Sequence, residues 1–399
     1  MPVESSSIDR AIDRVIGIDI RKIHDFGIGT YIRNLLTGLA STSRPEHTVF
    51  RLYTEDCYAA DPRRLPPSRF PMVMMHANRR SPLQGALPGL SDLQLYHAPH
   101  YLTPDPGKTP FILTVHDCIH LAPPPFPKAF NRLGNPSDQV FDAAKRFYHR
   151  SQGVIRFRRY VQRADAIITV SDATSRDLIA LTGIDDRKIT RVHNCIDRAF
   201  FTAGSLEDTG EFCRKFGLPE KDYVLYCGND LYHKNLAGLL TAWKNLSMRM
   251  QTPALVLAGP PRQFMIREYA DYLGISDSII LLDRIPSGKM PDLYHGALAL
   301  VMPSLAEGFG LPVAEAMAMG LPVVCSDIPV FHEITGDHAL FCDPYNPHSI
   351  EEAVRAAIRD RPSENDRVAA ARHQAEAFTM DRFLSGHVSV YLTELEAHR

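Results

Sequence analysis

Apolar runs and amphipathic stretches alternate along most of the chain. Residues 15–20 form a nearly continuous apolar run, and residues 30–40 repeat apolar positions at helical spacing. A glycine-containing turn at 26–29 lies between them. A continuous apolar run is typical of a parallel strand that is buried on both faces. The start of the chain therefore predicts a strand, a glycine turn and a helix.

The same alternation predicts an α/β protein with two parallel sheets. In the N-terminal half we expect further strands at 49–53, 95–97, 111–115 and 166–170, and a helix at 173–181. In the C-terminal half we expect strands at 223–227, 254–258, 279–282, 299–302, 322–325 and 339–342. The regular pattern lapses at 194–217, which we interpret as a connection between domains. We predict two doubly wound domains, 1–200 and 201–378, and a terminal segment, 379–399, with a helix at 380–397.

Composition excludes several classes of protein. The 399 residues include 44 Lys and Arg against 46 Asp and Glu, and this balance argues against a nucleic-acid partner. The seven cysteines show no C-x-x-C spacing, so we expect reduced thiols and a cytoplasmic location instead of disulfides or a zinc site. The N-terminus lacks an apolar signal region, and no apolar run approaches the roughly 20 residues of a membrane helix. Any membrane contact is expected to be peripheral.

The segment 302–320 carries the strongest chemical signal. A predicted strand ends near Pro303, a glycine-bearing loop follows, and a predicted helix begins at Pro312 and stops at Gly320. The unsatisfied N–H groups of such a helix start favour a phosphate or diphosphate, although a glycine turn of this kind also fits a purely structural connection. The candidate residues are Glu307, Gly308, Phe309, Gly310, Leu311 and Glu315, with Glu315 expected in the first helical turn.

A second candidate loop follows the predicted strand 223–227. It contains Gly228 and Asn229 and places Lys234 before an apolar helical pattern. A lysine at the mouth of a parallel sheet offers a point charge for a diphosphate. The structural alternative is a solvated lysine at a helix start.

Polar side chains also follow two strands of the N-terminal half. His116 and Asp117 come directly after the predicted strand 111–115, at the end of a sheet where ligands bind. A lone histidine is more often a hydrogen-bonded structural residue than a catalyst, and Asp117 and His120 fit loop capping. Ser171, after the strand 166–170, fits either a phosphate contact or a helix cap.

The string at 302–320 closely resembles the E-x7-E signature of the retaining glycosyltransferases of family 4, which have the GT-B fold. The resemblance runs from 15 to about 391 and is densest over 166–344. It implies that Glu307 lies near the donor sugar, that Glu315 lies near the nucleotide ribose and that Lys234 holds the donor diphosphate. It also implies that the helical segment after 378 crosses back onto the N-terminal domain.

The resemblance assigns roles to further positions. It implies that His116 lies close to the donor sugar and that N–H groups of a glycine loop at Gly27 and Gly29 meet the donor or acceptor. Nucleobases in this fold are held by backbone groups, here around Gly259 and Ile285. Many members place an arginine near the lysine, whereas this sequence has Asn229 and His233. Lys234 therefore acts alone, or with Arg284 or another residue.

These features predict a retaining hexosyltransferase. It would move a hexose from a nucleotide-diphosphate sugar to a saccharide or lipid-linked saccharide hydroxyl, in polysaccharide assembly. The donor is expected to be GDP-mannose, because the Tyr-His-Lys-Asn form of the lysine motif resembles mannosyltransferases, with a UDP-hexose as the alternative. No Asp-x-Asp occurs in the chain, so we expect no metal and no further cofactor.

Three other functions share part of this signal. A retaining glycoside hydrolase would need two carboxyl groups about 5–5.5 Å apart across a sugar, which one glutamate before a helix and one inside it make improbable. A nucleotide-sugar 2-epimerase has the same two-domain plan and would need no acceptor. A non-catalytic nucleotide-sugar-binding subunit would bind the donor without turnover.

The stretch 145–163 stands apart from these motifs. It holds seven Lys and Arg residues and no acidic residue, with aromatic and aliphatic side chains interleaved. Such a stretch fits peripheral contact with an anionic membrane on its inner face. The alternative is a solvated helix face over the N-terminal sheet.

Overall fold

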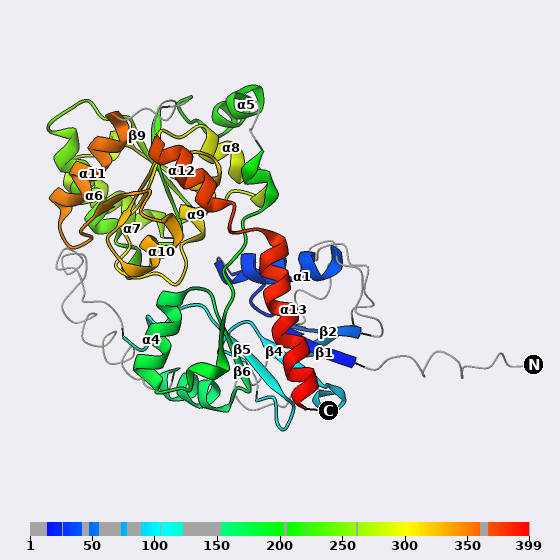
Figure 1. The fold of residues 1–399 in the computed structure, drawn as a ribbon. Helices are drawn as coiled ribbons and strands as arrows, with labels where there is room; N and C mark the ends of the chain where they lie inside the picture. The colour runs from blue at the N-terminus through cyan, green and yellow to red at the C-terminus, as the bar shows by residue number, and fades with distance from the viewer. Residues whose placement is uncertain are drawn as a thin grey trace, which may run out of the picture. The chain divides into compact units, whose positions relative to one another are not determined.

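The computed structural model describes residues 14–25, 27–41, 48–55, 73–77, 89–103, 105–122, 153–202, 206–220, 222–260, 262–359 and 366–398. The chain divides into two compact units (Figure 1). Unit 1 comprises Met1–Cys118, His149–Cys195 and Met380–Arg399, and unit 2 comprises Ile119–Tyr148 and Ile196–Thr379. Each unit holds one sheet, in which every described strand pair is parallel.

Unit 1 contains a seven-stranded sheet in the order β3-β2-β1-β4-β5-β6-β7. Its strands are β1 Arg14–Asp19, β2 Thr48–Glu55, β3 Val73–Ala77, β4 Leu95–Ala98, β5 Phe111–Val115, β6 Ala166–Thr169 and β7 Ile189–Arg191. Its helices are α1 Gly27–Ser41, α4 Asp172–Thr182 and α13 Met380–Ala397, with short 3₁₀ turns η2 Leu90–Asp92 and η4 Asp186–Lys188. Residues 153–163 are also helical. The central strands β4, β5 and β6 are buried along their whole length.

Unit 2 contains a six-stranded sheet in the order β10-β9-β8-β11-β12-β13. Its strands are β8 Tyr223–Cys227, β9 Ala254–Ala258, β10 Ile279–Leu282, β11 Ala299–Met302, β12 Val323–Ser326 and β13 Leu340–Cys342. Its helices are α5 Leu206–Phe216, α6 Leu236–Ser247, α7 Gln263–Leu273, α8 Met290–His295, α9 Leu311–Ala318, α10 Pro329–Thr335, α11 Pro347–Arg359 and α12 Asp366–Ala375. Short 3₁₀ turns are η5 Arg198–Phe201, η6 Tyr232–Lys234, η7 Ser276–Ser278 and η8 Ser287–Lys289.

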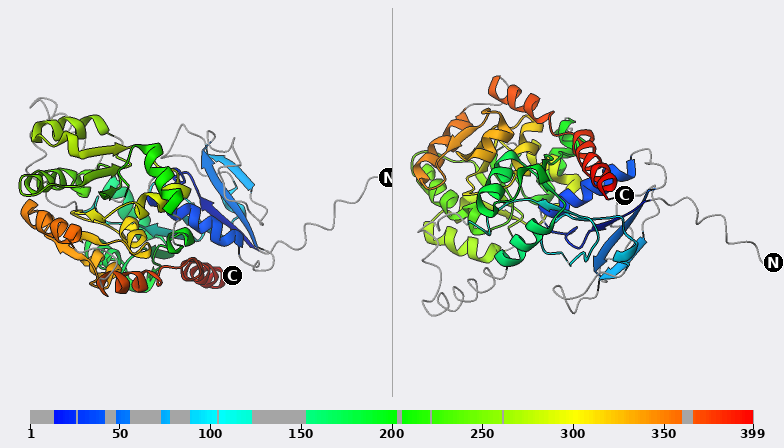
Figure 2. Two further views of the ribbon diagram at one scale, coloured as in Figure 1. Left: turned by 90° about the horizontal axis from the view of Figure 1, so that it is seen from above. Right: turned by 60° about the horizontal axis from the view of Figure 1, so that its bottom comes forward.

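Helices pack in separate groups within each unit. In unit 1, α13 packs on α1 and touches β4, whereas α4 packs on β6 and β7. In unit 2, α6 contacts α7 and α11, while α9 contacts α10 and α12. Figure 2 shows the helices and sheets in two further views. The parallel strands are thus covered by helices, as their continuous apolar runs require.

The sheet prediction is confirmed, with three corrections. The strands β3 and β7 were not predicted, because β3 lies where the family resemblance is thin and β7 is a short edge strand with a largely exposed pattern. The stretch 194–217 is not irregular throughout, since it contains α5 and η5. The glycine turn at 26–29 is wrong as well, because α1 already begins at Gly27.

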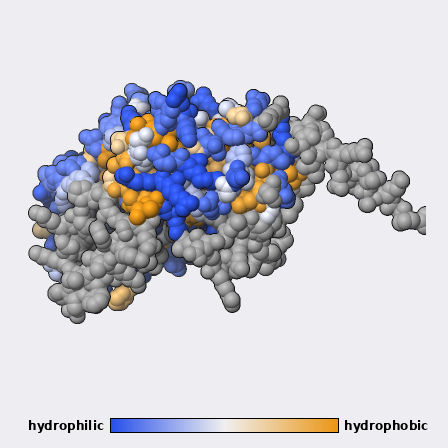
Figure 3. All heavy atoms as spheres, turned by 90° about the horizontal axis from the view of Figure 1, so that it is seen from below, coloured by the Kyte–Doolittle hydropathy of each residue, from blue (hydrophilic) through white to orange (hydrophobic). Residues whose placement is uncertain are grey.

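Among the described residues, no helix is both long enough and apolar enough to cross a membrane. On the face shown in Figure 3, hydrophobic residues form separate groups between hydrophilic ones wherever the atoms are coloured.

Candidate functional site

The sheet of unit 2 has one point at which the direction of its connections reverses. The chain runs outward from β8 to β9 and β10, and then returns to β11 on the other side of β8. The loops after β8 and β11 therefore diverge, and open parallel sheets bind ligands outside the carboxyl ends of the strands at such a switch point. Lys234 follows β8 and Glu307 follows β11, so both predicted residues lie on these two loops.

Lys234 and Glu307 form an ion pair across this switch point. Lys234 Nζ lies 2.6 Å from Glu307 Oε1, and the two side chains are 14% and 8% exposed. Ser304 Oγ donates to the same carboxylate oxygen over 2.8 Å. The N–H of Leu305 donates to the carbonyl of His233 over 2.7 Å, which ties the two loops together. A phosphate approaching Lys234 would therefore meet an ammonium that is already fixed in place.

Asn235 shapes the turn that carries Lys234, a role that the sequence analysis missed. It ends η6 in the left-handed region, with φ 58°, a conformation that asparagine tolerates better than most residues. Its buried Nδ2 donates to the carbonyls of Pro303 and Pro344 over 3.0 and 2.7 Å. One side chain thus joins the loops after β8, β11 and β13. The signal in the sequence is an asparagine placed directly before a helical pattern.

The loop before α9 has the glycine-dependent shape that was predicted. Gly310 has φ 88°, and a Cβ added there would lie 2.6 Å from the ring of Phe331, so only glycine fits. Gly308 and Phe309 are buried, and the ring of Phe309 packs edge-on to Phe378 with centroids 5.3 Å apart. The helix begins at Leu311 and has no side-chain cap at its N-terminus. An uncapped helix start beside Lys234 and Glu307 suits an anionic ligand.

Glu315 lies one turn deeper than predicted. Because α9 begins at Leu311, Glu315 is the fifth helical residue and lies outside the first turn. Tyr294 on α8 donates to Glu315 Oε2 over 2.7 Å. Burial raises the pKa of Glu315 to about 7, and the charge of Asp197 acts in the same direction. This carboxyl therefore takes up a proton more readily than an exposed glutamate does.

The predicted nucleobase region lies on the loops after β8, β9 and β10. Gly228 N–H donates to the carbonyl of Ala258, and Gly259 N–H donates to the carbonyl of Leu282, so the three strands are tied at their carboxyl ends. Gly259 has φ 92°, which explains the glycine. Asn229 Oδ1 accepts from the N–H of Leu231 over 3.2 Å and thus serves its own turn. After β10, the side chain of Arg284 is exposed and that of Ile285 is buried.

Asp230 and Arg262 also lie at this edge, and the sequence analysis did not select either residue. Asp230 follows β8 and Arg262 follows β9. Arg262 Nε lies 2.9 Å from Asp230 Oδ2, and the aspartate side chain is only 8% exposed. The sequence shows an aspartate after a glycine turn, which could have suggested Asp230. Its partner Arg262 is 32 residues away, so only the fold identifies the pair.

In unit 1, His116 follows β5 as predicted and is held on two sides. Its Nε2 lies 2.8 Å from the carbonyl of Pro99, which can only accept, so Nε2 carries the proton and Nδ1 keeps a lone pair. The ring meets the Tyr31 ring edge-on, with centroids 4.9 Å apart. Burial lowers the pKa of His116, so it is neutral at physiological pH. Its predicted place beside a donor sugar stays a prediction.

Two of the other predicted residues of unit 1, Gly29 and Ser171, have structural roles. Gly27 and Gly29 belong to the first turn of α1, not to a free loop, so the predicted glycine loop is corrected. A Cβ at Gly29 would lie 2.5 Å from the carbonyl of Ile23, which explains that glycine by close backbone approach. Ser171 is fully buried and caps α4 by accepting from the N–H of Thr174 over 3.0 Å.

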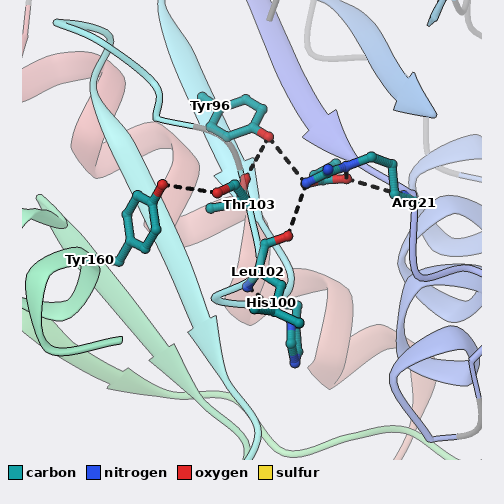
Figure 4. Close-up of polar contacts among 7 residues, drawn as sticks. Arg21, Tyr96, His100, Leu102, Thr103 and Tyr160 are labelled. Atoms are coloured by element: carbon teal, nitrogen blue, oxygen red, sulfur yellow. Dashed lines mark hydrogen bonds and ion pairs between the residues drawn. The ribbon is translucent and has the colours of Figure 1, made fainter. Parts of the chain in front are cut away.

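The switch point of unit 1 lies between β1 and β4 and is filled by a polar network (Figure 4). Arg21 binds both carboxylate oxygens of Asp19 over 2.9 and 2.6 Å, and its Nη2 also donates to the carbonyl of Leu102 over 3.0 Å. Tyr96 donates to Asp19 over 3.3 Å. Tyr160 donates to the carbonyl of Thr103 over 2.9 Å. The network fixes the loop after β4 to the end of β1.

A second buried network in unit 1 begins at α13. His387 Nδ1 lies 2.7 Å from the carbonyl of Phe383, so Nδ1 carries the proton and Nε2 accepts from the hydroxyl of Tyr31 over 2.5 Å. The oxygen of Tyr31 then accepts from Thr114 over 2.8 Å. Burial lowers the pKa of His387 to about 4. The helix is thus joined to α1 and β5 through a neutral imidazole.

The network continues to β4 and returns to α13. Thr114 Oγ1 accepts from His97 Nε2 over 2.8 Å, which leaves His97 Nδ1 to accept from the hydroxyl of Tyr391 over 2.7 Å. Burial lowers the pKa of His97 well below its usual value. Every bond in this histidine–tyrosine chain is made only when both imidazoles are neutral.

The described part of the basic stretch is the helix 153–163. Its Phe157 and Val161 side chains are fully buried, so they face the core of unit 1. Arg159 and Arg163 lie 3.3 and 3.6 Å from Asp105. Positions 145–152 lie outside the described residues, and membrane contact through 145–163 stays a prediction.

Two family models match the chain in succession. The model for Glycosyltransferase Family 4 matches residues 27–200, and the model for Glycosyl transferases group 1 matches residues 208–374. O-antigen chain mannosyltransferase B of Escherichia coli is 28% identical over 314 residues, which is 74% of each chain. O-antigen chain mannosyltransferase RfbU of Salmonella typhimurium is 30% identical over 198 residues, which spans 49% of this chain and 51% of that protein.

Solved structures share the fold at low sequence identity. Sucrose-phosphate synthase of Thermosynechococcus elongatus superposes with a TM-score of 0.70 at 15% identity and covers 96% of this chain and 100% of its own. Anabaena HepE in complex with UDP-glucose has a TM-score of 0.70 at 14% identity, covering 95% of this chain and 99% of its own. At this identity the likeness bears on the fold alone, and it agrees with the predicted GT-B class.

Proposed function

Because the chain belongs to the family 4 glycosyltransferases with the GT-B fold, we propose that it transfers a hexose, with mannose favoured, from a nucleotide-diphosphate sugar. The acceptor is a hydroxyl of a saccharide or lipid-linked saccharide, and the anomeric configuration is retained. The relatives named for O-antigen mannosyl transfer support mannose as the sugar. The Tyr-His-Lys-Asn string at 232–235 agrees with that choice.

The ion pair between Lys234 and Glu307 carries this proposal. In the proposed complex the donor diphosphate takes the ammonium of Lys234, and sugar hydroxyls donate to the carboxylate that the lysine releases. The uncapped N-terminus of α9 faces the same phosphate groups. As the bond to the sugar breaks, negative charge grows on the departing diphosphate, and a fixed ammonium and fixed N–H groups stabilise that charge without reorganising.

The same residues favour catalysis without metal. The chain contains no Asp-x-Asp, and the candidate phosphate site consists of a lysine and backbone N–H groups. We therefore propose that no metal ion bridges the diphosphate. Transfer should continue in excess EDTA, and loss of transfer that magnesium or manganese restores would contradict this part of the proposal.

A donor panel tests the proposal directly. Thermal unfolding of the full chain is measured with GDP, UDP, GDP-mannose and UDP-glucose. A ligand at 100 times its dissociation constant should stabilise the protein by about 2.7 kcal/mol, and we expect the GDP ligands to give the larger shift. Release of nucleotide diphosphate is then followed with and without a mannose-terminated oligosaccharide acceptor.

The outcomes separate the proposed transferase from its alternatives. Acceptor-dependent release of the nucleotide diphosphate, with an unchanged anomeric configuration in the product, supports the transferase. Donor epimerisation without acceptor would indicate the 2-epimerase, and donor binding without turnover would indicate a binding subunit. Hydrolysis of a plain glycoside would revive the hydrolase, although Glu307 and Glu315 have separate partners, Lys234 and Tyr294.

A further inference from the structure

Asp230 holds Arg262 in one orientation beside the candidate donor site. The backbone N–H and Nε of Arg262 both donate to Asp230 Oδ2, over 3.0 and 2.9 Å. Nη2 donates to the carbonyl of Asp230 over 2.9 Å and to its Oδ1 over 3.2 Å. Nη1 makes no hydrogen bond or ion pair with any residue that the structure describes, and the side chain is 53% exposed. The guanidinium is therefore immobilised on one side and open on the other.

The position of this pair in the sheet is next to the switch point of unit 2. Asp230 follows β8, and Arg262 follows β9, the neighbouring strand, whose Ala258 is in register with Cys227. The loop that carries Asp230 is the same loop that carries Lys234. Arg262 thus lies at the carboxyl edge of the sheet, on the opposite side of β8 from Glu307.

The polar groups around Lys234 leave room for a second N–H donor. Lys234 is paired with Glu307 and Arg262 with Asp230, so neither pair carries a net charge, and Arg262 contributes a fixed, open N–H group. Asn229, in the glycine turn of the same loop, is neutral and bonds its own backbone. A nucleotide-diphosphate sugar carries a negative charge on each of its two phosphates. A fixed N–H donor of a guanidinium suits such a group, because arginine is suited to phosphate recognition and loses little freedom on binding once it is already held.

We propose that Arg262, oriented by Asp230, supplies a second phosphate contact for the donor diphosphate through Nη1. This inference rests on the proposed function, because it assigns a further residue to the same donor. Arg262 is a binding residue in this assignment, and Asp230 is a positioning residue that acts through it.

Isothermal titration of the full chain with GDP, UDP, guanosine, uridine and inorganic pyrophosphate tests the assignment. Arg262→Ala should raise the dissociation constant of the diphosphate ligands about tenfold and leave that of the nucleosides within about twofold. Arg267→Ala, which removes an equal charge from the exposed side of α7, the helix that directly follows Arg262, is the matched control and should change neither. Arg262→Lys should recover only part of the affinity, because an ammonium lacks the planar fork that Asp230 holds.

Asp230→Asn distinguishes two explanations of anion binding by Arg262: orientation of the guanidinium by Asp230, and simple attraction between charges. The substitution removes a negative charge, so attraction alone would tighten the binding of an anion. Loss of the clamp should weaken it severalfold instead, with an unchanged midpoint of thermal unfolding as the check on folding. Arg262→Lys supplies the same distinction if Asp230→Asn does not fold.

The contrary results are distinct. Equal affinity of Arg262→Ala and Arg267→Ala for the diphosphates would overturn the assignment, as would tighter binding by Asp230→Asn. An equal loss for nucleosides and diphosphates would place Arg262 at the base and not at the phosphates. A parent chain that binds none of the nucleotides would contradict the proposed function itself, whereas a parent that binds them with an unaffected Arg262→Ala contradicts this inference alone.

Discussion

The two sheets have switch points of the same topology but opposite chemistry. In unit 1 Asp19, at the end of β1, pairs with Arg21 in the turn that follows it, and Arg21 also donates to the carbonyl of Leu102 in the loop after β4. In unit 2 the two charges come from different loops, with Lys234 after β8 and Glu307 after β11. In the first arrangement the carboxylate and the guanidinium belong to the same short segment. The second pairs charges from two loops, and under the proposed function the phosphates and hydroxyls of the donor replace each partner.

Buried titratable groups repeat this contrast. In unit 1 a chain of neutral imidazoles and hydroxyls holds α13, whereas in unit 2 burial raises the pKa of Glu315, on the helix that starts at the candidate site. Both cases arise from burial, which disfavours the charged form, but the sign of the resulting pH dependence differs for a base and an acid. The comparison shows that the same sheet topology can carry different polar groups at its switch point. In unit 1 these groups hold the fold together, and in unit 2 they form a pair of charges from two loops.

The largest effect should come from the exchangeable pair. Lys234→Ala removes the fixed ammonium from the diphosphate, and kcat/KM should fall about 10³-fold, as when one transition-state donor is lost elsewhere. Binding of the nucleoside alone should barely change, because it has no phosphate. Transfer rates and titrations of nucleotide and nucleoside measure the two effects. Lys244→Ala on α6 is the control, and equal losses for both ligands would make Lys234 purely structural.

The next effect concerns acid stability in unit 1. His387 has a pKa of about 4 when folded and about 6.5 when unfolded, so the unfolded state binds more protons between these values. Stability from this residue is complete above pH 6.5 and is lost as the pH falls toward 4, with a loss of about 2 kcal/mol between pH 7 and pH 5. Urea unfolding at both pH values should show it. His387→Phe should reduce the dependence, whose remainder comes from His97 and His116 because burial also lowers their pKa values, and the exposed His398→Gln should leave it unchanged.

Hydrogen exchange distinguishes a local effect of protonating His387 from a loss of stability in both units at low pH. Protonating His387 or His97 breaks the chain that joins α13 to α1, β4 and β5, and His116 adds a third imidazole close by. Amides of α13 should therefore lose protection at pH 5 before those of β8 and β11. Simultaneous loss in both units would contradict a local cause.

Glu315 should give a smaller effect of the opposite sign. Its pKa rises from 4.5 unfolded to about 7 folded, so the folded state binds more protons between these values and stability falls as the pH rises through them. Glu315→Gln removes this cost and should stabilise the protein by about 1 kcal/mol more at pH 8 than at pH 5, allowing for solvent around the side chain. Thermal unfolding at both pH values measures it. An unchanged difference between variant and parent would mean that Glu315 titrates normally.

An effect of similar size compares two helix starts. Ser171 caps α4 in unit 1, whereas α9 in unit 2 has no side-chain cap. Ser171→Ala should therefore cost about 1 kcal/mol of stability and leave donor affinity unchanged. Chemical unfolding and donor titration test the two parts. A clear loss of donor affinity at unchanged stability would instead support the phosphate contact that the sequence left open for Ser171.

Sequence periodicity predicted most of the regular structure, because strands of a parallel sheet that are buried on both faces have continuous apolar sequences. The strands at 223–227, 254–258, 279–282 and 299–302 have the predicted bounds. The edge strand β7 escaped prediction because it is short and exposed, and an edge has only one neighbour to bury it. The start of α1 was misplaced because its glycines were interpreted as a turn, whereas both lie in the helix and Gly29 is needed for the close approach of the Ile23 carbonyl.

The candidate site divides in the same way. Local pattern indicated residues next to strand ends or glycine turns, such as Lys234, Glu307 and Gly310, and the resemblance to family 4 decided between a functional and a structural role for them. The sequence does not identify Tyr294 and Arg262, and it gives only the position of Asn235 before a helix, because their partners are distant in the chain: Glu315 for Tyr294, Asp230 for Arg262 and Pro344 for Asn235.

The sequence by itself determined the class of fold, the family and the loops that bear charge, because hydrophobic period and local motifs are properties of neighbouring residues. Only the tertiary structure decided which charges meet. Lys234 and Glu307 are 73 positions apart, and Tyr31 and His387 are 356 apart. Parallel sheets bring such distant loops to one edge and distant helices to one face. Desolvation there, which no local pattern encodes, sets the protonation of Glu315, His97 and His387.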